Sequence, residues 1–104
     1  LGLSRSSIIN ALLAEGLQGV TQGYQGLHLL PMYQNKIAYG KEGFPWSINS
    51  NNINYEKGIC PIAEYLFDES FFALQLCLYS LSENDVDLIV TTFQKVWKNL
   101  ESLK

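Results

Sequence analysis

The pattern of apolar residues predicts a helix near the start of the chain. Four apolar side chains recur at helical spacing behind Ser4, a residue type that caps a first turn by accepting hydrogen bonds from its free N–H groups. They are Ile8, Ile9, Leu12 and Leu13. Gly16 offers the left-handed conformation that often ends a helix, so we expect a helix at about 5–15.

The same kind of pattern predicts a longer helix near the other end. Ser82 and Asp85 have the spacing of a capping box, and the acidic first turn and the lysines of the last turn complement the helix dipole. The apolar stripe of this helix consists of Val86, Ile89, Val90, Phe93, Val96, Trp97 and Leu100.

The middle of the chain predicts shorter elements. A strand is expected near 19–24, weakened by its glycines, and a second one over 71–79, where leucines occupy every second position. Proline suits the first position of a helix. Pro31 therefore predicts a single helical turn, and Pro61 predicts a helix near 61–70.

Residues 34–58 lack clear periodicity. Such a long irregular stretch inside a compact domain indicates a functional excursion rather than a simple connection. Phe44 and Trp46 are large apolar residues on this polar loop, and we expect them to insert into a partner or into the larger body of a parent protein.

These elements predict a mixed α/β (α+β) fold. We expect a single domain over 1–104, with two or three short, mostly antiparallel strands packed by about three helices. Because a two-stranded sheet is marginal in water, we expect a third strand upstream of Leu1, and a sheet edge that a loop or another copy covers. The chain begins without an initiator Met, and we interpret it as a piece of a longer protein.

Composition and charge narrow the classes of function. A net charge of −3 and a pI of about 4.9 provide no basic surface for nucleic acid. No apolar run approaches the ~20 residues of a membrane span, and we expect a cytoplasmic protein. Only 16% of the residues are charged, whereas about 25% is usual, which predicts that part of the surface is covered in the intact protein.

His28, the only histidine, is the main candidate for chemistry. One histidine without cysteines or carboxylates at ligand spacing argues against a metal site. Two interpretations stay open: a structural hydrogen bond in a tight turn, or a polar group that faces a ligand beside Tyr24 and Gln25. A thiol at a helix start, such as Cys60, can be reactive, but we favour a small buried side chain. Cys77 is expected in the core.

Four segments resemble, in order, the C-terminal part of the DegT/DnrJ/EryC1/StrS family of sugar aminotransferases that depend on pyridoxal phosphate (PLP). The segments are residues 4–17, 23–33, 60–70 and 81–87. The second is similar to the family's H-Y-x-P-L-H-x-x-P-x-Y, the third to P-x-A-E-x-x-x-x-x-x-L-x-L-P and the fourth to L-[ST]-E-x-D-[VI]-D. Gly23 stands where the family often has His, and Gly26 where it usually has Pro.

The resemblance implies the small C-terminal domain of a fold-type-I PLP enzyme. In such enzymes a lysine forms a Schiff base with PLP, whose ring acts as an electron sink. Family members are homodimers that transfer an amino group, typically from glutamate, to a nucleotide-linked keto-sugar, as in the synthesis of cell-surface polysaccharide. The lysine and the phosphate site belong to a large domain. The implied partners of this chain are therefore that PLP-binding domain, a second subunit and the nucleotide-sugar.

The resemblance also implies a set of candidate site residues. His28 matches the second His of the family motif and Tyr24 matches its Tyr, in a stretch near the substrate entrance. We therefore expect Tyr24, Gln25 and His28 to contact substrate, and no catalytic or cofactor-binding residue in this chain, which would be inactive alone. The alternative is a stand-alone, non-catalytic module that derives from such a domain and acts by protein contact.

Overall fold

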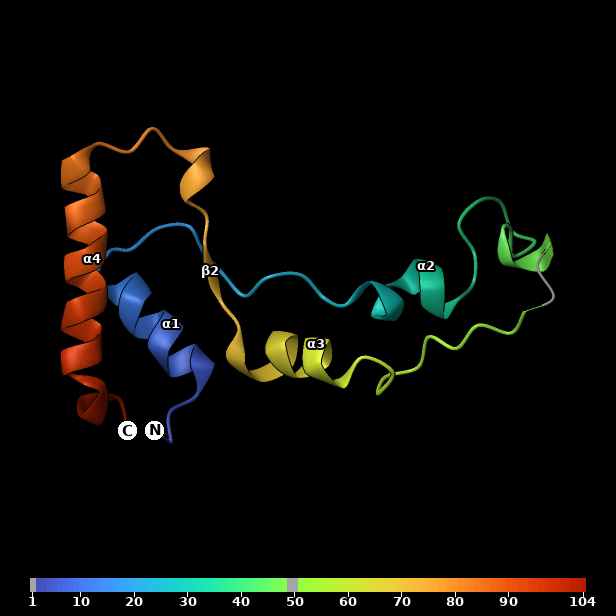
Figure 1. The fold of residues 1–104 in the computed structure, drawn as a ribbon, viewed down its shortest axis with the longest axis horizontal. Helices are drawn as coiled ribbons and strands as arrows, with labels where there is room; N and C mark the ends of the chain where they lie inside the picture. Colours follow the sequence, from blue (N-terminus) through green and yellow to red (C-terminus); the bar gives the residue numbers. More distant parts are fainter. Residues whose placement is uncertain (1, 49–50) are drawn as a thin grey trace. The chain divides into compact units, whose positions relative to one another are not determined.

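The computed structural model describes residues 2–48 and 51–104, which form a mixed helix and strand fold (Figure 1). The described residues contain four α-helices and one two-stranded antiparallel sheet. The chain divides into two compact units. Unit 1 comprises the described residues up to Gly23 together with Glu69–Lys104, and unit 2 is Tyr24–Asp68.

Unit 1 contains the apolar core. Helix α1 (Arg5–Ala14) packs beside helix α4 (Glu83–Lys98), as Figure 1 shows. Strand β1 (Val20–Thr21) pairs with β2 (Ala73–Leu74). Leu12 is fully buried between these elements with Leu17 and Val96. Half-buried apolar residues surround these three side chains, among them Phe72, whose ring stacks on that of Phe93.

Both predicted terminal helices are confirmed, and so are their caps. The Ser4 hydroxyl accepts from the Ser7 N–H at 3.0 Å, and Gly16 has a φ of +91° after the last turn of α1. At α4 the Ser82 hydroxyl accepts from the Asp85 N–H, and an Asp85 carboxylate oxygen accepts from the Ser82 N–H at 2.8 Å. This is the reciprocal capping box that the sequence predicted.

The predicted strand over 71–79 is wrong beyond Leu74. After one further backbone bond, from Gln75 N–H to the Gly19 carbonyl, the chain turns into a 3₁₀ segment at Leu76–Leu78. The reason lies in the partner strand. β1 has only two residues and lies between Gly19 and Gly23, whose positive φ angles bend the chain away from a ladder.

The cysteine predictions are wrong as well. Cys60 and Cys77 are both exposed and unbonded to each other. Cys77 lies in the 3₁₀ segment instead of a core-facing strand, so the alternation that predicted its burial does not apply. Cys60 lies directly before α3 (Pro61–Tyr65), on the surface of unit 2.

Unit 2 consists of short helical pieces. A 3₁₀ turn at Leu27–Leu29 is followed by α2 (Pro31–Gln34), which confirms the turn predicted after Pro31. The helix predicted near 61–70 is present as α3, which continues into a π-helical turn at Leu66–Ser70.

The stretch between α2 and α3 packs on itself through aromatic rings. Trp46 lies edge-on to both Tyr33 and Tyr55, and its indole N–H donates to the Tyr55 hydroxyl at 3.0 Å. The sequence predicted that Trp46 inserts into a partner or into the larger body of a parent protein, whereas in the structure its ring contacts neighbours within unit 2. Phe44 is more exposed and contacts Tyr39 across an isolated bridge.

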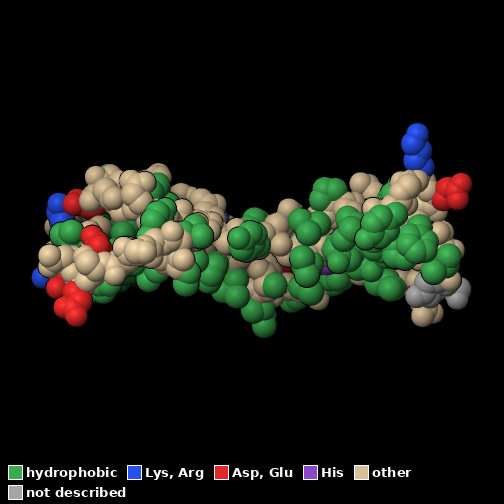
Figure 2. Space-filling view, turned by 90° about the horizontal axis from the view of Figure 1, so that it is seen from above, with side chains coloured by type: hydrophobic (Ala, Val, Ile, Leu, Met, Phe, Trp, Pro, Cys, Tyr) green, Lys and Arg blue, Asp and Glu red, His purple; other side chains and the backbone are tan. Residues whose placement is uncertain are grey.

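Much of the apolar surface stays uncovered. Hydrophobic side chains gather on the visible surface over α2 and the loop that follows it (Figure 2). On α4, residues Val86, Val90 and Trp97 of the predicted stripe are about half exposed, while Val96 is buried. No helix in the described ranges combines the length and apolarity that a membrane span needs.

Candidate functional site

The Glu64 carboxylate on α3 accepts several hydrogen bonds within unit 2. Both of its oxygens accept from the Gly58 N–H at 2.8 Å, and Oε1 also accepts from the Cys60 N–H at 3.2 Å. Oε1 lies 2.8 Å from Nε2 of His28. Among the described residues, Glu64 and His28 are the buried polar side chains, with exposed fractions of 7% and 9%.

These donors keep Glu64 ionised. The Gly58 N–H holds the pKa of the carboxyl below its ordinary value of 4.5, and the bonds from His28 and Cys60 act in the same direction, whereas burial acts against them. An ionised carboxylate only accepts hydrogen bonds. It follows that Nε2 of His28 carries a hydrogen and donates a hydrogen bond to the Glu64 carboxylate.

The local fold places His28 for this bond. His28 lies in the 3₁₀ turn at Leu27–Leu29, and its imidazole contacts Glu64 of α3. The Gln34 side-chain amide donates to the His28 carbonyl at 2.6 Å. The same amide nitrogen donates to the Tyr55 carbonyl at 2.6 Å. Three separate parts of unit 2 therefore meet at this centre: the turn, α2 with the aromatic cluster, and the start of α3.

The structure separates the three residues predicted to contact substrate. His28 is buried against Glu64, which is the structural hydrogen bond that the sequence left open as one interpretation. Tyr24 is 90% exposed, and Gln25 is exposed beside it. The exposed hydroxyl and amide are thus available to a ligand, while the imidazole is turned inward.

Sequence reasoning did not single out Glu64. Glu64 is only one position of the segment 60–70 that resembles the family motif. The sequence does contain a signal for Glu64, because a carboxylate three residues after Pro61, the expected helix start, can reach back to the free N–H groups of that end. The partnership with the only histidine, 36 positions away, required the fold.

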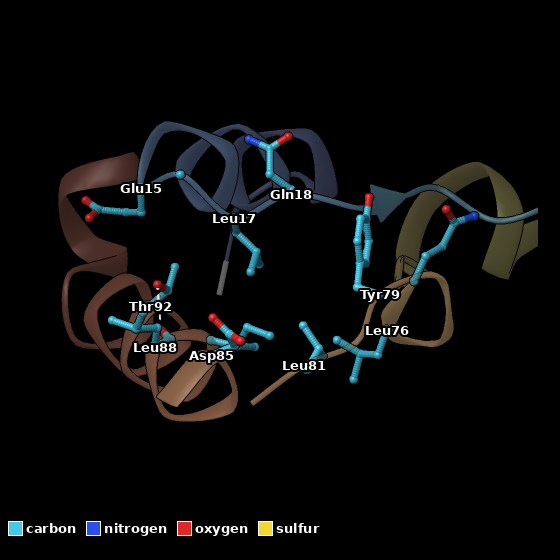
Figure 3. A pocket seen from close by; sticks show the side chains of 12 residues that line it. Glu15, Leu17, Gln18, Leu76, Tyr79, Leu81, Asp85, Leu88 and Thr92 are labelled. Atoms are coloured by element: carbon cyan, nitrogen blue, oxygen red, sulfur yellow. Dashed lines mark hydrogen bonds between the residues drawn. The ribbon is translucent and has the colours of Figure 1, made fainter. Parts of the chain in front are cut away.

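Unit 1 carries a separate feature, an apolar groove of about 440 Å³. Figure 3 shows the side chains of Leu17, Leu76, Leu81 and Leu88 around it, with Tyr79 to one side and Asp85 and Thr92 on α4. The Asp85 carboxylate accepts from the Ser82 hydroxyl and from the Ser82 backbone N–H, and these two bonds hold its pKa below the ordinary value of 3.8. Because the leucines dominate its lining, the groove offers mainly apolar contact.

The residues present do not fit PLP. A lysine that forms a Schiff base needs a desolvated pocket, because the amine must lose its proton. None of the chain's lysines is buried in the structure; they are Lys36, Lys41, Lys57, Lys95, Lys98 and Lys104. Four of them donate to a side-chain oxygen at the surface. Within residues 2–48 and 51–104, no group of histidine, cysteine and acidic side chains could hold a metal ion.

Comparisons of the chain with protein-family models, with curated proteins and with solved structures find no match.

Proposed function

We propose that this chain is the C-terminal domain of a cytoplasmic, PLP-dependent sugar aminotransferase of the DegT/DnrJ/EryC1/StrS type. The enzyme transfers an amino group from glutamate to a nucleotide-linked keto-sugar, which yields 2-oxoglutarate and an amino-sugar for polysaccharide or related sugar synthesis. The large domain of the same parent protein holds PLP, and two parent subunits form the active enzyme. This chain supplies a substrate-side surface and packing contacts.

The observation that carries the proposal is the bond between His28 and Glu64. His28 matches the second His of the H-Y-x-P-L-H-like part of segment 23–33, and Glu64 matches the Glu of the P-x-A-E-like part of segment 60–70. These positions lie in two different segments of the resemblance, yet their side chains meet in a buried bond of 2.8 Å. Two motif positions that depend on each other in this way support the view that the segments belong to one inherited pattern.

The uncovered apolar surface supports the proposed partner. Isolated apolar residues on a surface are common, but a groove lined by several leucines together with a half-exposed face of α4 is typical of an interface. The proposal assigns this surface of unit 1 to the large domain. A two-stranded sheet is also marginal alone, and contact with a larger body would stabilise it.

The test is an amino-transfer assay on the full-length protein that contains this sequence. The protein is incubated with PLP, glutamate and a panel of nucleotide-linked keto-sugars, and 2-oxoglutarate is measured. The proposal predicts formation of 2-oxoglutarate that depends on both the sugar and PLP. The 104-residue chain alone is the matched control and is expected to give none.

Two results would contradict the proposal. One is a full-length protein that binds no PLP and transfers no amino group with any member of the panel. The other is a natural protein that consists of this short chain alone and forms a stable complex with an unrelated protein, which is the outcome expected of a non-catalytic interaction module.

A further inference from the structure

Gly26 differs from the other glycines that the structure describes, which all have positive φ angles. Its φ of −55° and ψ of 132° are values that alanine and even proline adopt without strain. The backbone therefore does not require glycine at this position, and another reason must explain it.

The reason is the His28 ring. A Cβ atom at position 26 would lie 2.8 Å from Cε1 and 3.0 Å from Nδ1 of His28, which is too close for either contact. The ring cannot move aside freely, because its Nε2 donates to Glu64. The Glu64 carboxylate is in turn held by the N–H groups of Gly58 and Cys60. Only a residue without a side chain fits under the imidazole in this orientation.

We propose that Gly26 and Glu64 together fix the inward orientation of the His28 imidazole, and that a side chain at position 26 releases the ring toward solvent. Glu64 holds Nε2 of the ring by a hydrogen bond, and Gly26 leaves room for the adjoining Cε1 and Nδ1 atoms. His28 is then a positioning residue, which ties the 3₁₀ turn to α3, and residue 26 determines whether the imidazole is available to a ligand.

This arrangement has a consequence for specificity. With glycine at 26, the polar side chains that segment 24–28 presents to solvent are those of Tyr24 and Gln25. With the proline that the resemblance leads one to expect there, the imidazole would join them. That last comparison alone rests on the proposed function; the orientation of the ring does not.

The direct test measures the protonation and hydrogen bonding of the His28 imidazole by NMR. Histidine is labelled with ¹⁵N in the longest natural form of the protein that contains this sequence, and the spectrum of a His28→Gln variant assigns the signals of His28. The wild type is expected to show a protonated, hydrogen-bonded Nε2. Gly26→Ala and Glu64→Leu should each lose that signature. Gln25→Ala, at the neighbouring exposed position, should retain it.

A double-mutant cycle tests the steric part even where a spectrum is poor. Gly26→Ala is expected to lower the urea midpoint of unfolding in the wild type, because its methyl group displaces the ring. In a His28→Ala background the same substitution should leave the midpoint unchanged or raise it, because the space is empty and alanine restricts the unfolded chain. If Gly26→Ala prevents folding, recovery of a folded protein in the double variant supports the proposal.

The proposal would be overturned if the His28 signals were unchanged in Gly26→Ala, or if Nε2 carried no hydrogen in the wild type. An equal loss of stability, or of folding, from Gly26→Ala with and without the His28 ring would also overturn it. None of these outcomes bears on amino transfer, so failure of this inference is distinguishable from failure of the proposed function.

Discussion

At the scale of single residues, the Glu64 carboxylate connects several parts of unit 2 by hydrogen bonds. It is buried, and it joins the Gly58 and Cys60 backbone to the imidazole of His28. A buried group with this many donors is costly to remove, because each donor is then left without its partner. Substitutions here should therefore affect the local fold more than substitutions of the exposed Tyr24 or Gln25.

Glu64→Gln is predicted to change how stability depends on pH. The folded-state pKa of Glu64 lies below 4.5, so its contribution is fully present above that pH and is lost as the pH falls through the folded-state value. The variant should be less stable than the wild type at neutral pH, and the difference should shrink below pH 4.5. Urea unfolding across this range measures it. For Glu42→Gln, at an exposed loop position, the difference in unfolding free energy from the wild type should not shrink in this way. A difference between wild type and Glu64→Gln that stays constant across the pH range would contradict the prediction.

The residue scale also shows the limit of what a sequence can predict. Ser4, Gly16 and the Ser82–Asp85 capping box are local, because every partner lies within a few positions, and all were predicted correctly. The bond between His28 and Glu64 joins residues 36 positions apart, and nothing in the local pattern links them. Its geometry also explains Gly26, which the sequence marked only as a departure from the family pattern.

At the scale of elements, the sequence predicted the helices and the places of both strands, but it overestimated the lengths of the strands. The period of apolar residues in α4 repeats over several turns, so no single position decides it, and the shorter repeat in α1 is supported by a serine cap and a terminal glycine. A strand instead needs a partner. Residues 71–79 alternate as a strand should, but β1 offers only Val20 and Thr21 for pairing, and the alternation continues beyond the ladder into a 3₁₀ turn.

Ser82→Ala is predicted to destabilise α4 by about 1 kcal/mol, the usual cost of removing a capping hydroxyl. The Asp85 N–H then loses its acceptor, and the Asp85 carboxylate loses the hydroxyl that donates to it at 2.7 Å. The free energy of unfolding, measured by urea denaturation, checks the prediction. Ser80→Ala, just before the helix on an exposed residue, is the matched control, and equal effects of the two variants would contradict the capping role.

At the scale of the whole molecule, substitutions in the apolar groove of unit 1 can test whether a large domain packs against this chain. Leu88 lines the groove and is 66% exposed. If the large domain packs there, Leu88→Asp buries a charge in the full-length protein and lowers its melting temperature. Gln94→Asp places the same charge on an exposed position of α4 and should change the melting temperature little. Similar shifts for the two variants would show that nothing covers the groove.

The measurement that tests the central claim most directly is the location of the lysine that binds PLP. The full-length protein is reduced with borohydride in the presence of PLP, digested, and analysed by mass spectrometry for a lysine that carries the reduced cofactor. If this chain is the C-terminal domain of an aminotransferase, one modified lysine is expected, and it lies outside these 104 residues. Modification of a lysine within them, or no specific modification anywhere in the protein, would contradict it.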